Sequence, residues 1–288
     1  EYAEAQVREL IERYRPSVLW NDVAWPATGD RLWPLLAHYY EHVPDGVVND
    51  RWMPWSPALG LARTDLGRRA IDAGSRRQVR RDRGLLPPKP PHFDVRTPEY
   101  LSFDDIQRDP WETVRGMDRS FGFNRNSRPE HFIEQSDLIW TLVDIAAKGG
   151  NLLINVGPRG VDAQLPAEQT ARLDWLEAWL RQHSEAVMAT SPWVTPGTTT
   201  AEGHAVRYTA RDDDVFAFVR GSGPLTLPDV LATPTTRVTT VGGSSLPWHH
   251  SPGGLVVDVP PPGPNPLPVV CLHAVVARSY ERSGNQLP

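Results

Sequence analysis

Two acidic residues stand where apolar stretches of this sequence end. Asp22 follows the apolar run at 18–20, and Glu99 lies near the end of the alternating stretch at 93–100. Glycoside hydrolysis requires two carboxyl groups: an ionised carboxylate attacks or stabilises the anomeric carbon, and a protonated carboxyl group supplies a proton to the leaving oxygen. An Asp after a strand is also typical of a turn or a helix N-cap. The chain has 35 acidic residues, so the pairing of these two is a hypothesis that the rest of the sequence must support.

The stretches around Asp22 predict alternating helices and strands. Apolar residues spaced at i, i+3, i+4 and i+7 predict a helix over about 4–14, followed by a buried strand at 18–20. A second helix over about 31–42 precedes a short strand at 47–48, which ends in the polar run Asn49-Asp50-Arg51. This order favours a parallel sheet with crossover helices. In a (β/α) barrel the carboxyl ends of the strands carry the chemistry.

Further along the chain the same patterns continue after an interruption. Residues 53–92 are rich in Pro and Arg, which predicts an irregular insertion whose basic cluster is better explained as a solvated helical excursion than as a surface for an acidic partner. A helix capped by Ser136 is predicted to run to about residue 148, where Gly149 and Gly150 stop it. A buried strand at 151–156 and a last helix over 166–183 follow.

The pattern changes after about residue 190, where short β-rich runs alternate with turn residues. We expect strands at 204–210, 215–220, 224–227, 237–241, 254–259 and 268–276. Asp212 to Asp214 are expected in a hairpin loop, and His249 and His250 in an exposed turn rather than in a metal site. The sequence therefore predicts a β-sandwich domain at 191–288 after an α/β domain at 1–190.

Composition excludes several classes of function. A formal net charge of −5 excludes a broadly basic nucleic-acid binder, and no apolar run reaches the roughly 18 residues of a membrane span. The single cysteine, Cys271, lies in an apolar run and is expected to be a buried, inert thiol. No Cys/His cluster or Gly-rich phosphate loop occurs, so we expect neither a metal nor a cofactor.

Several motifs occur in a characteristic order over about residues 1–193. They are WND followed by WP, then PDGVVNDRW, TPEY, SFGFN, LVD followed by KGGNLLINVGP, and TSPW. In these motifs the chain resembles the retaining α-L-fucosidase family of glycoside hydrolases. The block KGGNLLINVGP is the most specific of them, and the shorter motifs gain weight from their order.

The resemblance implies a role for five residues. Asp22 corresponds to the family's nucleophile and Glu99 to its general acid/base, while Arg51 lies near the sugar. Trp20 and Phe121 would form an apolar wall for the methyl group of the 6-deoxy sugar, although packing in the core also explains both aromatic residues. The implied partner is a fucosylated oligosaccharide or glycoconjugate, without nucleic acid or membrane, and a homo-oligomer is compatible with this interpretation.

The resemblance also implies the fold, and the chain departs from it in places. We expect the C-terminal portion of a (β/α) TIM-like barrel without its N-terminal strands, followed by a β-sandwich. The chain starts inside a helix and without Met, so we expect an N-terminal portion to be missing and the chain to be weakly active or inactive. The insertion at 53–92 is long for the family. Two alternatives remain, a non-catalytic carbohydrate-binding protein and a retaining glycosidase for another sugar.

Overall fold

The structure is a computed structural model that describes residues 1–22, 25–55, 64–67, 69, 73, 84–264 and 266–278. Most of the expected helical excursion within 53–92, with all of its arginine cluster except Arg69, lies outside the described residues. The chain divides into two compact units, which are described separately. Unit 1 comprises Glu1–Leu101 and Arg108–Val114, and unit 2 comprises Ser102–Gln107 and Arg115–Pro288.

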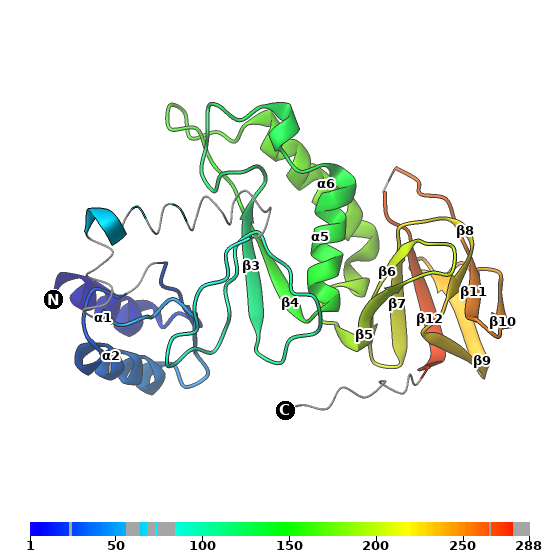
Figure 1. The fold of residues 1–288 in the computed structure, drawn as a ribbon, viewed down its shortest axis with the longest axis horizontal. Helices are drawn as coiled ribbons and strands as arrows, with labels where there is room; N and C mark the ends of the chain where they lie inside the picture. Colours follow the sequence, from blue (N-terminus) through cyan, green and yellow to red (C-terminus); the bar gives the residue numbers. More distant parts are fainter. Residues whose placement is uncertain are drawn as a thin grey trace. The chain divides into compact units, whose positions relative to one another are not determined.

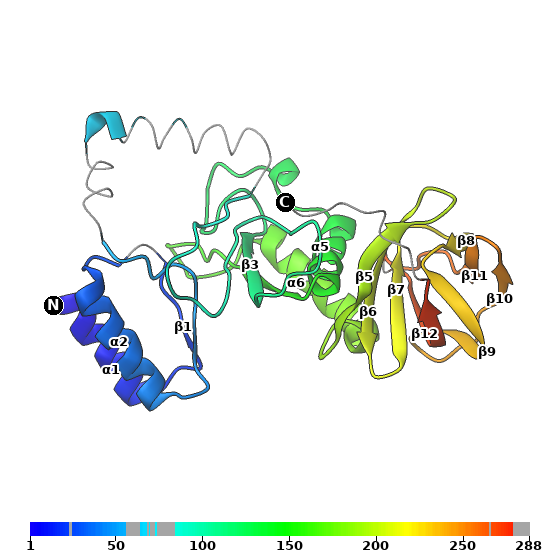
Figure 2. The same cartoon turned by 60° about the horizontal axis from the view of Figure 1, so that its bottom comes forward.

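Unit 1 begins with two helices that share an apolar core. Helix α1 (Tyr2–Tyr14) and helix α2 (Gly29–His42) lie side by side, blue in Figure 1. Strand β1 (Val18–Leu19), labelled in Figure 2, follows α1, and strand β2 (Val47–Val48) follows α2. The buried residues of this core include Ile11, Leu19, Leu32, Leu35, Leu36, Tyr39, Val48 and Trp52. The predicted order of elements is confirmed, but Val18 is 44% exposed rather than buried.

Neighbouring segments of unit 1 pair in parallel, as the sequence predicted. Strand β1 pairs in parallel with β2, and Asn49 forms a parallel bridge with Val95. Arg96 and Glu99 form parallel bridges with Trp111 and Val114 of strand β3 (Trp111–Gly116), which the sequence did not predict. The stretch at 93–100 makes only isolated bridges, as expected where Pro98 lacks an N–H donor. The strands of the described residues form no closed barrel.

Unit 2 contains two long helices. Helix α5 (Gln135–Ala147) precedes strand β4 (Gly150–Asn155), and helix α6 (Ala167–His183) begins after Pro166, as predicted. Short 3-10 helices occur at η2 (Pro129–His131) and η3 (Ser184–Ala186). Helix α5 ends where Gly149 adopts a positive φ of 80°, a conformation that glycine tolerates best. Its N-cap is Glu134 rather than Ser136, so the predicted start was wrong by two residues.

The rest of unit 2 is made of antiparallel strands in two sheets. The five-stranded sheet has the order β5-β6-β7-β12-β9, and the three-stranded sheet has the order β10-β11-β8. The strand bounds are β5 (Ser191–Thr199), β6 (Ala205–Arg211), β7 (Asp214–Val219), β8 (Gly223–Leu227), β9 (Val230–Thr240), β10 (Trp248–Ser251), β11 (Gly254–Val259) and β12 (Val269–Ala277). Residues from both sheets form one buried cluster.

Six of these strands match the predicted ones, and the hairpin at Asp212 is confirmed by the pairing of Arg211 with Asp214. Strands β5 and β10 were not predicted, and β9 starts seven residues earlier than the predicted 237. His249 and His250 are exposed, as expected, but they lie on β10 and pair with β11 instead of forming a turn. The prediction of a turn there was therefore wrong.

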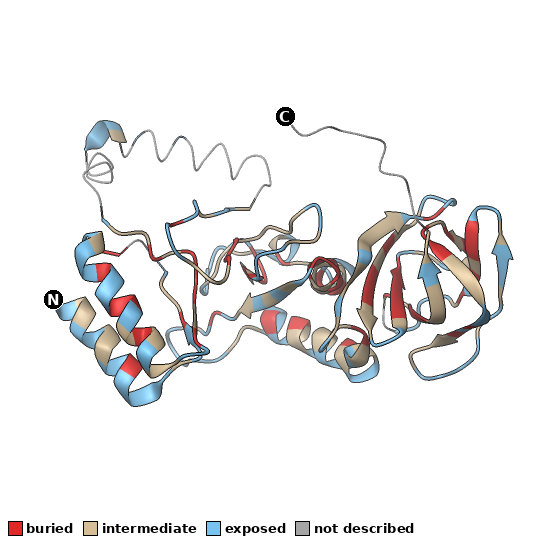
Figure 3. Cartoon of the chain, turned by 90° about the horizontal axis from the view of Figure 1, so that it is seen from below, coloured by how far each residue is buried: buried red, intermediate tan, exposed pale blue. Residues whose placement is uncertain are grey.

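Strand β7 is buried on both faces because the helices of unit 2 cover one side of the five-stranded sheet. Side chains alternate along a strand, so Val215, Ala217 and Val219 join the cluster between the sheets. Phe216 and Phe218 face the other way, into a cluster with Ile139, Val143, Trp179 and Cys271. Figure 3 colours the buried residues of the chain red. Burial raises the pKa of the Cys271 thiol to about 12, in keeping with the predicted inert thiol.

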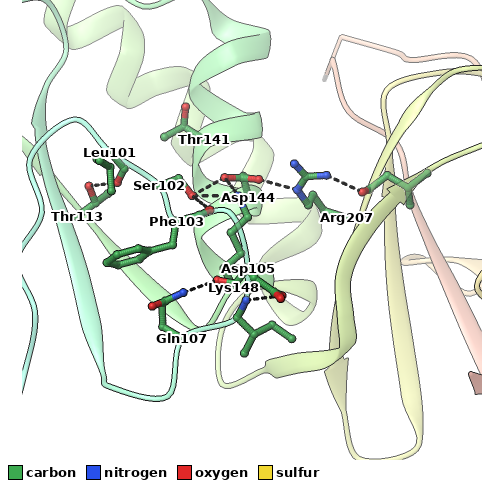
Figure 4. Close-up of polar contacts among 12 residues, drawn as sticks. Leu101, Ser102, Phe103, Asp105, Gln107, Thr113, Thr141, Asp144, Lys148 and Arg207 are labelled. Carbon is green, nitrogen blue, oxygen red and sulfur yellow. Dashed lines mark hydrogen bonds and ion pairs between the residues drawn. The ribbon is translucent and has the colours of Figure 1, made fainter. Parts of the chain in front are cut away.

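A buried carboxylate joins α5 to the β strands of unit 2 (Figure 4). Asp144 accepts hydrogen bonds from Lys148 Nζ at 2.7 Å, from Ser102 Oγ at 2.5 Å and from Arg207 Nε at 2.6 Å. Burial by itself would raise the pKa of Asp144, but these hydrogen bonds outweigh it, and the pKa lies below its ordinary value. Arg207 also stacks on Trp140 of α5, with its guanidinium carbon 5.1 Å from the ring centroid.

No helix in the described part of the chain is both long and apolar enough for a membrane span.

Candidate active site

The parallel register of unit 1 brings the candidate site residues to the same level. Val18 pairs with Val47 and Leu19 with Val48, and continuing this register past the strand ends places Asp22 level with Arg51. The bridge between Asn49 and Val95 places Arg51 level with Thr97 in the same way. The carboxyl ends of adjacent parallel strands are where α/β proteins place their chemistry. The local fold therefore explains why residues distant in sequence meet here.

Arg51 contacts both candidate carboxylates through one nitrogen. Its Nη1 lies 3.2 Å from Asp22 Oδ1 and 2.7 Å from Glu99 Oε1. These two oxygens therefore lie no more than 5.9 Å apart, the sum of the distances 3.2 and 2.7 Å. The Arg51 side chain is 10% exposed and that of Glu99 is 20% exposed, whereas Asp22 is 83% exposed. The structure thus brings together Asp22, Arg51 and Glu99, as the sequence predicted.

A second carboxylate network holds Arg51 in place. Arg51 donates from Nε to Thr97 Oγ1 at 3.0 Å and from Nη2 to the Thr97 carbonyl at 3.1 Å. The Thr97 hydroxyl in turn donates to Asp50 Oδ1 at 2.6 Å, and the Thr97 N–H donates to the same oxygen at 3.0 Å. Asp50 is fully buried and also accepts from Arg96 Nε at 2.6 Å. Fixed acceptors of this kind limit the positions that a guanidinium can take.

Two asparagine side chains tie the strand ends together. The Asn21 N–H donates to Asn49 Oδ1 at 2.8 Å, and Asn49 Nδ2 donates to the Asn21 carbonyl at 2.7 Å. Asn21 Nδ2 also donates to the Arg51 carbonyl at 3.0 Å. Since Asn21 directly precedes Asp22, these bonds fix the backbone from which Asp22 projects. The sequence predicted a strand end at the polar run 49–51, but no sequence pattern predicted the hydrogen bonds of Asn21 with Asn49 and Arg51 or the role of Thr97.

The backbone of Glu99 is held on both sides. Leu85 and Glu99 exchange both backbone hydrogen bonds, at 2.8 and 2.7 Å, and Val114 lies on the other side. A Cβ on Gly84 would lie 2.0 Å from the Glu99 carbonyl oxygen, so only glycine permits this approach. Tyr100, the next residue, has a positive φ of 51°, a strained conformation for a non-glycine residue that is enriched at functional sites. The described end of the insertion thus braces Glu99.

The two predicted aromatic residues lie in different units. Trp20 is half-buried and stands between β1 and Asn21, two residues before Asp22. Nearby in unit 1, Trp25 packs against Trp52 with ring centroids 5.2 Å apart. Phe121 belongs to unit 2 and is half-buried in the loop at 118–127. The structure therefore places Trp20 next to the carboxylates along the chain and leaves the role of Phe121 as an expectation.

The loop that carries Phe121 is built by buried groups within unit 2. Asp118 is 5% exposed and accepts hydrogen bonds from the Ser120 N–H at 2.8 Å and from the Ser127 hydroxyl. Gly157 packs against the loop so closely that a Cβ there would lie 2.4 Å from the Phe123 nitrogen. The Gly157 N–H donates to the buried Gln169 side chain of α6 at 2.8 Å. This packing gives a physical reason for the glycine in the NVGP stretch.

The site residues do not form a metal centre. Within the part of the chain that the structure describes, no group of three or more His, Cys, Asp or Glu side chains is arranged to hold a metal ion. The reactive groups that unit 1 brings together are two carboxylates within 5.9 Å, a limit given by the 3.2 and 2.7 Å contacts to one arginine.

Comparison with known proteins agrees with the motifs. The family model described as α-L-fucosidase matches residues 1–185. The chain belongs to the α-L-fucosidase family. An α-L-fucosidase of Branchiostoma floridae is 32% identical over 285 residues, which are 95% of this chain and 56% of that protein. The tissue α-L-fucosidase of Bos taurus is 29% identical over 276 residues, 91% of this chain and 51% of that protein.

Solved structures of α-fucosidases match the fold. A structure of Thermotoga maritima α-fucosidase in complex with a mechanism-based inhibitor has a TM-score of 0.73 and 33% identity, covering 94% of this chain and 56% of that chain. A structure of the same enzyme in complex with fucose has a TM-score of 0.71 and 32% identity, and the match covers 94% of this chain and 55% of that chain. The chain thus spans about half the length of the α-L-fucosidases that it matches.

Proposed function

We propose that this chain carries the two catalytic carboxylates of an α-L-fucosidase that acts with retention of configuration. The observation that supports this proposal most strongly is the limit of 5.9 Å between Asp22 Oδ1 and Glu99 Oε1, set by the 3.2 and 2.7 Å contacts to Arg51. Retaining glycosidases have carboxyl groups about 5–5.5 Å apart, whereas inverting enzymes need about 6.5–9.5 Å to admit a water molecule. Membership of the α-L-fucosidase family supports the choice of sugar.

In the proposed mechanism each carboxylate has one role per step. The exposed Asp22 carboxylate attacks the anomeric carbon and displaces the leaving oxygen, which takes a proton from Glu99. A water molecule then gives its proton to Glu99 and attacks the anomeric carbon, which breaks the bond to Asp22 and releases fucose. Arg51 orients both carboxylates and a sugar hydroxyl. Trp20 supplies apolar surface for the methyl group, and the substrate class is a fucosylated oligosaccharide or glycoconjugate.

We further propose that residues 1–190 are the C-terminal part of a (β/α) barrel and that 191–288 are a β-sandwich. The parallel pairing of β1, β2 and the stretch at 95–99 favours the first assignment. The shared core between the five-stranded and three-stranded sheets favours the second.

The function is tested by turnover of aryl α-L-fucosides, with Glu99→Gln and Glu112→Gln compared with the parent chain. Glu112 is a half-buried carboxyl in the same unit that has no role in the mechanism. Loss of the general acid should slow fucosides with poor leaving groups by about 10²–10⁴-fold and dinitrophenyl fucoside far less, whereas Glu112→Gln should change neither. Equal loss on both substrates, or hydrolysis of α-L-galactosides in preference to α-L-fucosides, would contradict the proposal.

A further inference from the structure

The short segment at 84–87, at the described end of the insertion, lies directly beside Glu99. Leu85 and Glu99 exchange two backbone hydrogen bonds and form an antiparallel bridge. Arg96 Nη2 also donates to the Pro87 carbonyl at 2.8 Å, so the segment is fixed at a second point. The close approach of Gly84 to the backbone of Glu99 and Tyr100 completes this attachment.

The pairing determines which way the Leu85 side chain points. Residues that are directly opposite in an antiparallel pair project from the same face, with Cβ atoms about 4.5–5.5 Å apart. The Leu85 side chain therefore stands beside the Glu99 carboxyl group. Leu86, the next residue, projects from the opposite face. Both leucines are exposed, at 46% for Leu85 and 40% for Leu86, but only Leu85 shares a face with Glu99.

A general acid must lie within hydrogen-bond reach of the leaving oxygen, about 2.6–3.2 Å. If Glu99 is the general acid, the aglycone bonded to the leaving oxygen must lie beside the Glu99 side chain. An exposed leucine at this point offers apolar contact area to that group and cannot offer a hydrogen bond. Arg51, which contacts Glu99 from another segment, supplies the polar side of the same region.

We propose that Leu85 is a specificity-determining residue that contacts the leaving group, or aglycone, and favours fucosides with an apolar aglycone such as an aryl or alkyl group. This inference rests on the proposed function, because it takes Glu99 as the acid that protonates the leaving oxygen. It assigns the described end of the insertion to substrate recognition.

The test compares Leu85→Ala with Leu86→Ala on three substrates. They are p-nitrophenyl α-L-fucoside, an α-L-fucosyl disaccharide and α-L-fucosyl fluoride, whose leaving group is too small to reach Leu85. Leu85→Ala should lower kcat/KM for the aryl fucoside by about tenfold, with little effect on the disaccharide and none on the fluoride. Leu86→Ala serves as the matched control and should leave all three substrates unchanged.

The outcomes separate the two proposals. If the parent chain hydrolyses neither the fluoride nor the aryl fucoside, the proposed function fails, and the role of Leu85 fails with it. If the parent chain is active but Leu85→Ala slows the fluoride as much as the aryl fucoside, Leu85 acts through the structure around Glu99 and the inference is wrong. Equal effects of Leu85→Ala and Leu86→Ala would also overturn it.

Discussion

Replacing Asp144 tests how the helices and β strands of unit 2 are held together. Asp144 is the shared acceptor for Lys148 on its own helix and for Arg207 on β6. The side chains of Asp144 and Lys148 are only 11% and 7% exposed. In Asp144→Ala the Lys148 ammonium group would lose its carboxylate without gaining water. Breaking a buried pair in this way costs about 3–5 kcal/mol.

A neighbouring residue on the same helix provides the matched control. Asp137 also pairs with an arginine, Arg220, which directly follows β7, at 2.7 Å, and Arg220 stacks on the same Trp140 ring as Arg207. The Asp137 side chain is 60% exposed, so its ion pair is screened by water and contributes about 0–1 kcal/mol. The two variants remove similar contacts and differ mainly in burial.

Hydrogen–deuterium exchange of the α5 segment measures the difference directly. Asp144→Ala should speed exchange of its protected amides by about 100-fold or more, and Asp137→Ala by less than about fivefold. The pKa of Asp144 is lowered in the folded state, so its stabilising contribution is complete above its ordinary value of 3.8 and is lost as pH falls through the lower, folded value. Asp144→Asn should therefore weaken the loss of stability in acid. Similar exchange in Asp144→Ala and Asp137→Ala would refute the reasoning.

Three further predictions concern other parts of the chain. Thr97→Val removes the hydroxyl that accepts a hydrogen bond from Arg51, and it should lower kcat/KM for an aryl fucoside by about tenfold or more. Thr97→Ser keeps the hydroxyl and should retain activity. Equal rates for the two variants would contradict the role of the hydroxyl. Gly157→Ala places a Cβ 2.4 Å from backbone of the 118–127 loop, while Gly160→Ala meets nothing within 4 Å. Only the former should destabilise the protein, by about 1–3 kcal/mol in urea unfolding. Cys271, with its pKa raised to about 12 by burial, should resist an aromatic disulfide reagent at pH 8 until the protein is unfolded, and a fast reaction of the folded protein would count against its burial.

The helices and most strands could be predicted because their patterns are local. The apolar spacing of α1 and α2 and the glycine stop after α5 are visible in short windows of sequence. Strand β5 was missed because proline and glycine, at Pro192, Pro196 and Gly197, are unusual inside a strand. Its pairing with β6 also contains a register shift between Pro192 and Gly197. Strand β10 has only four residues, two of them exposed histidines, and its pairing with β11 is a tertiary feature.

The sequence predicted the three candidate residues that meet at the site, but not the contacts that support them. Asp22, Arg51 and Glu99 were marked by motifs, and the structure brings them together. The support from Asp50 and Thr97 depends on contacts between segments that are 46 to 47 residues apart in sequence, which no local pattern encodes. The contact of Leu85 with Glu99 was hidden for the same reason, because it joins the far end of a long insertion to the site.

The identity of the nucleophile is tested most directly by Asp22→Gly with and without added azide. The variant should lose turnover of an activated aryl α-L-fucoside. Azide should then occupy the space of the missing carboxylate, displace the aryl alcohol and yield β-L-fucosyl azide, the product of a single inversion. Unchanged hydrolysis by Asp22→Gly, or a loss of activity that azide does not restore while Asp30→Gly remains active, would contradict the assignment of Asp22.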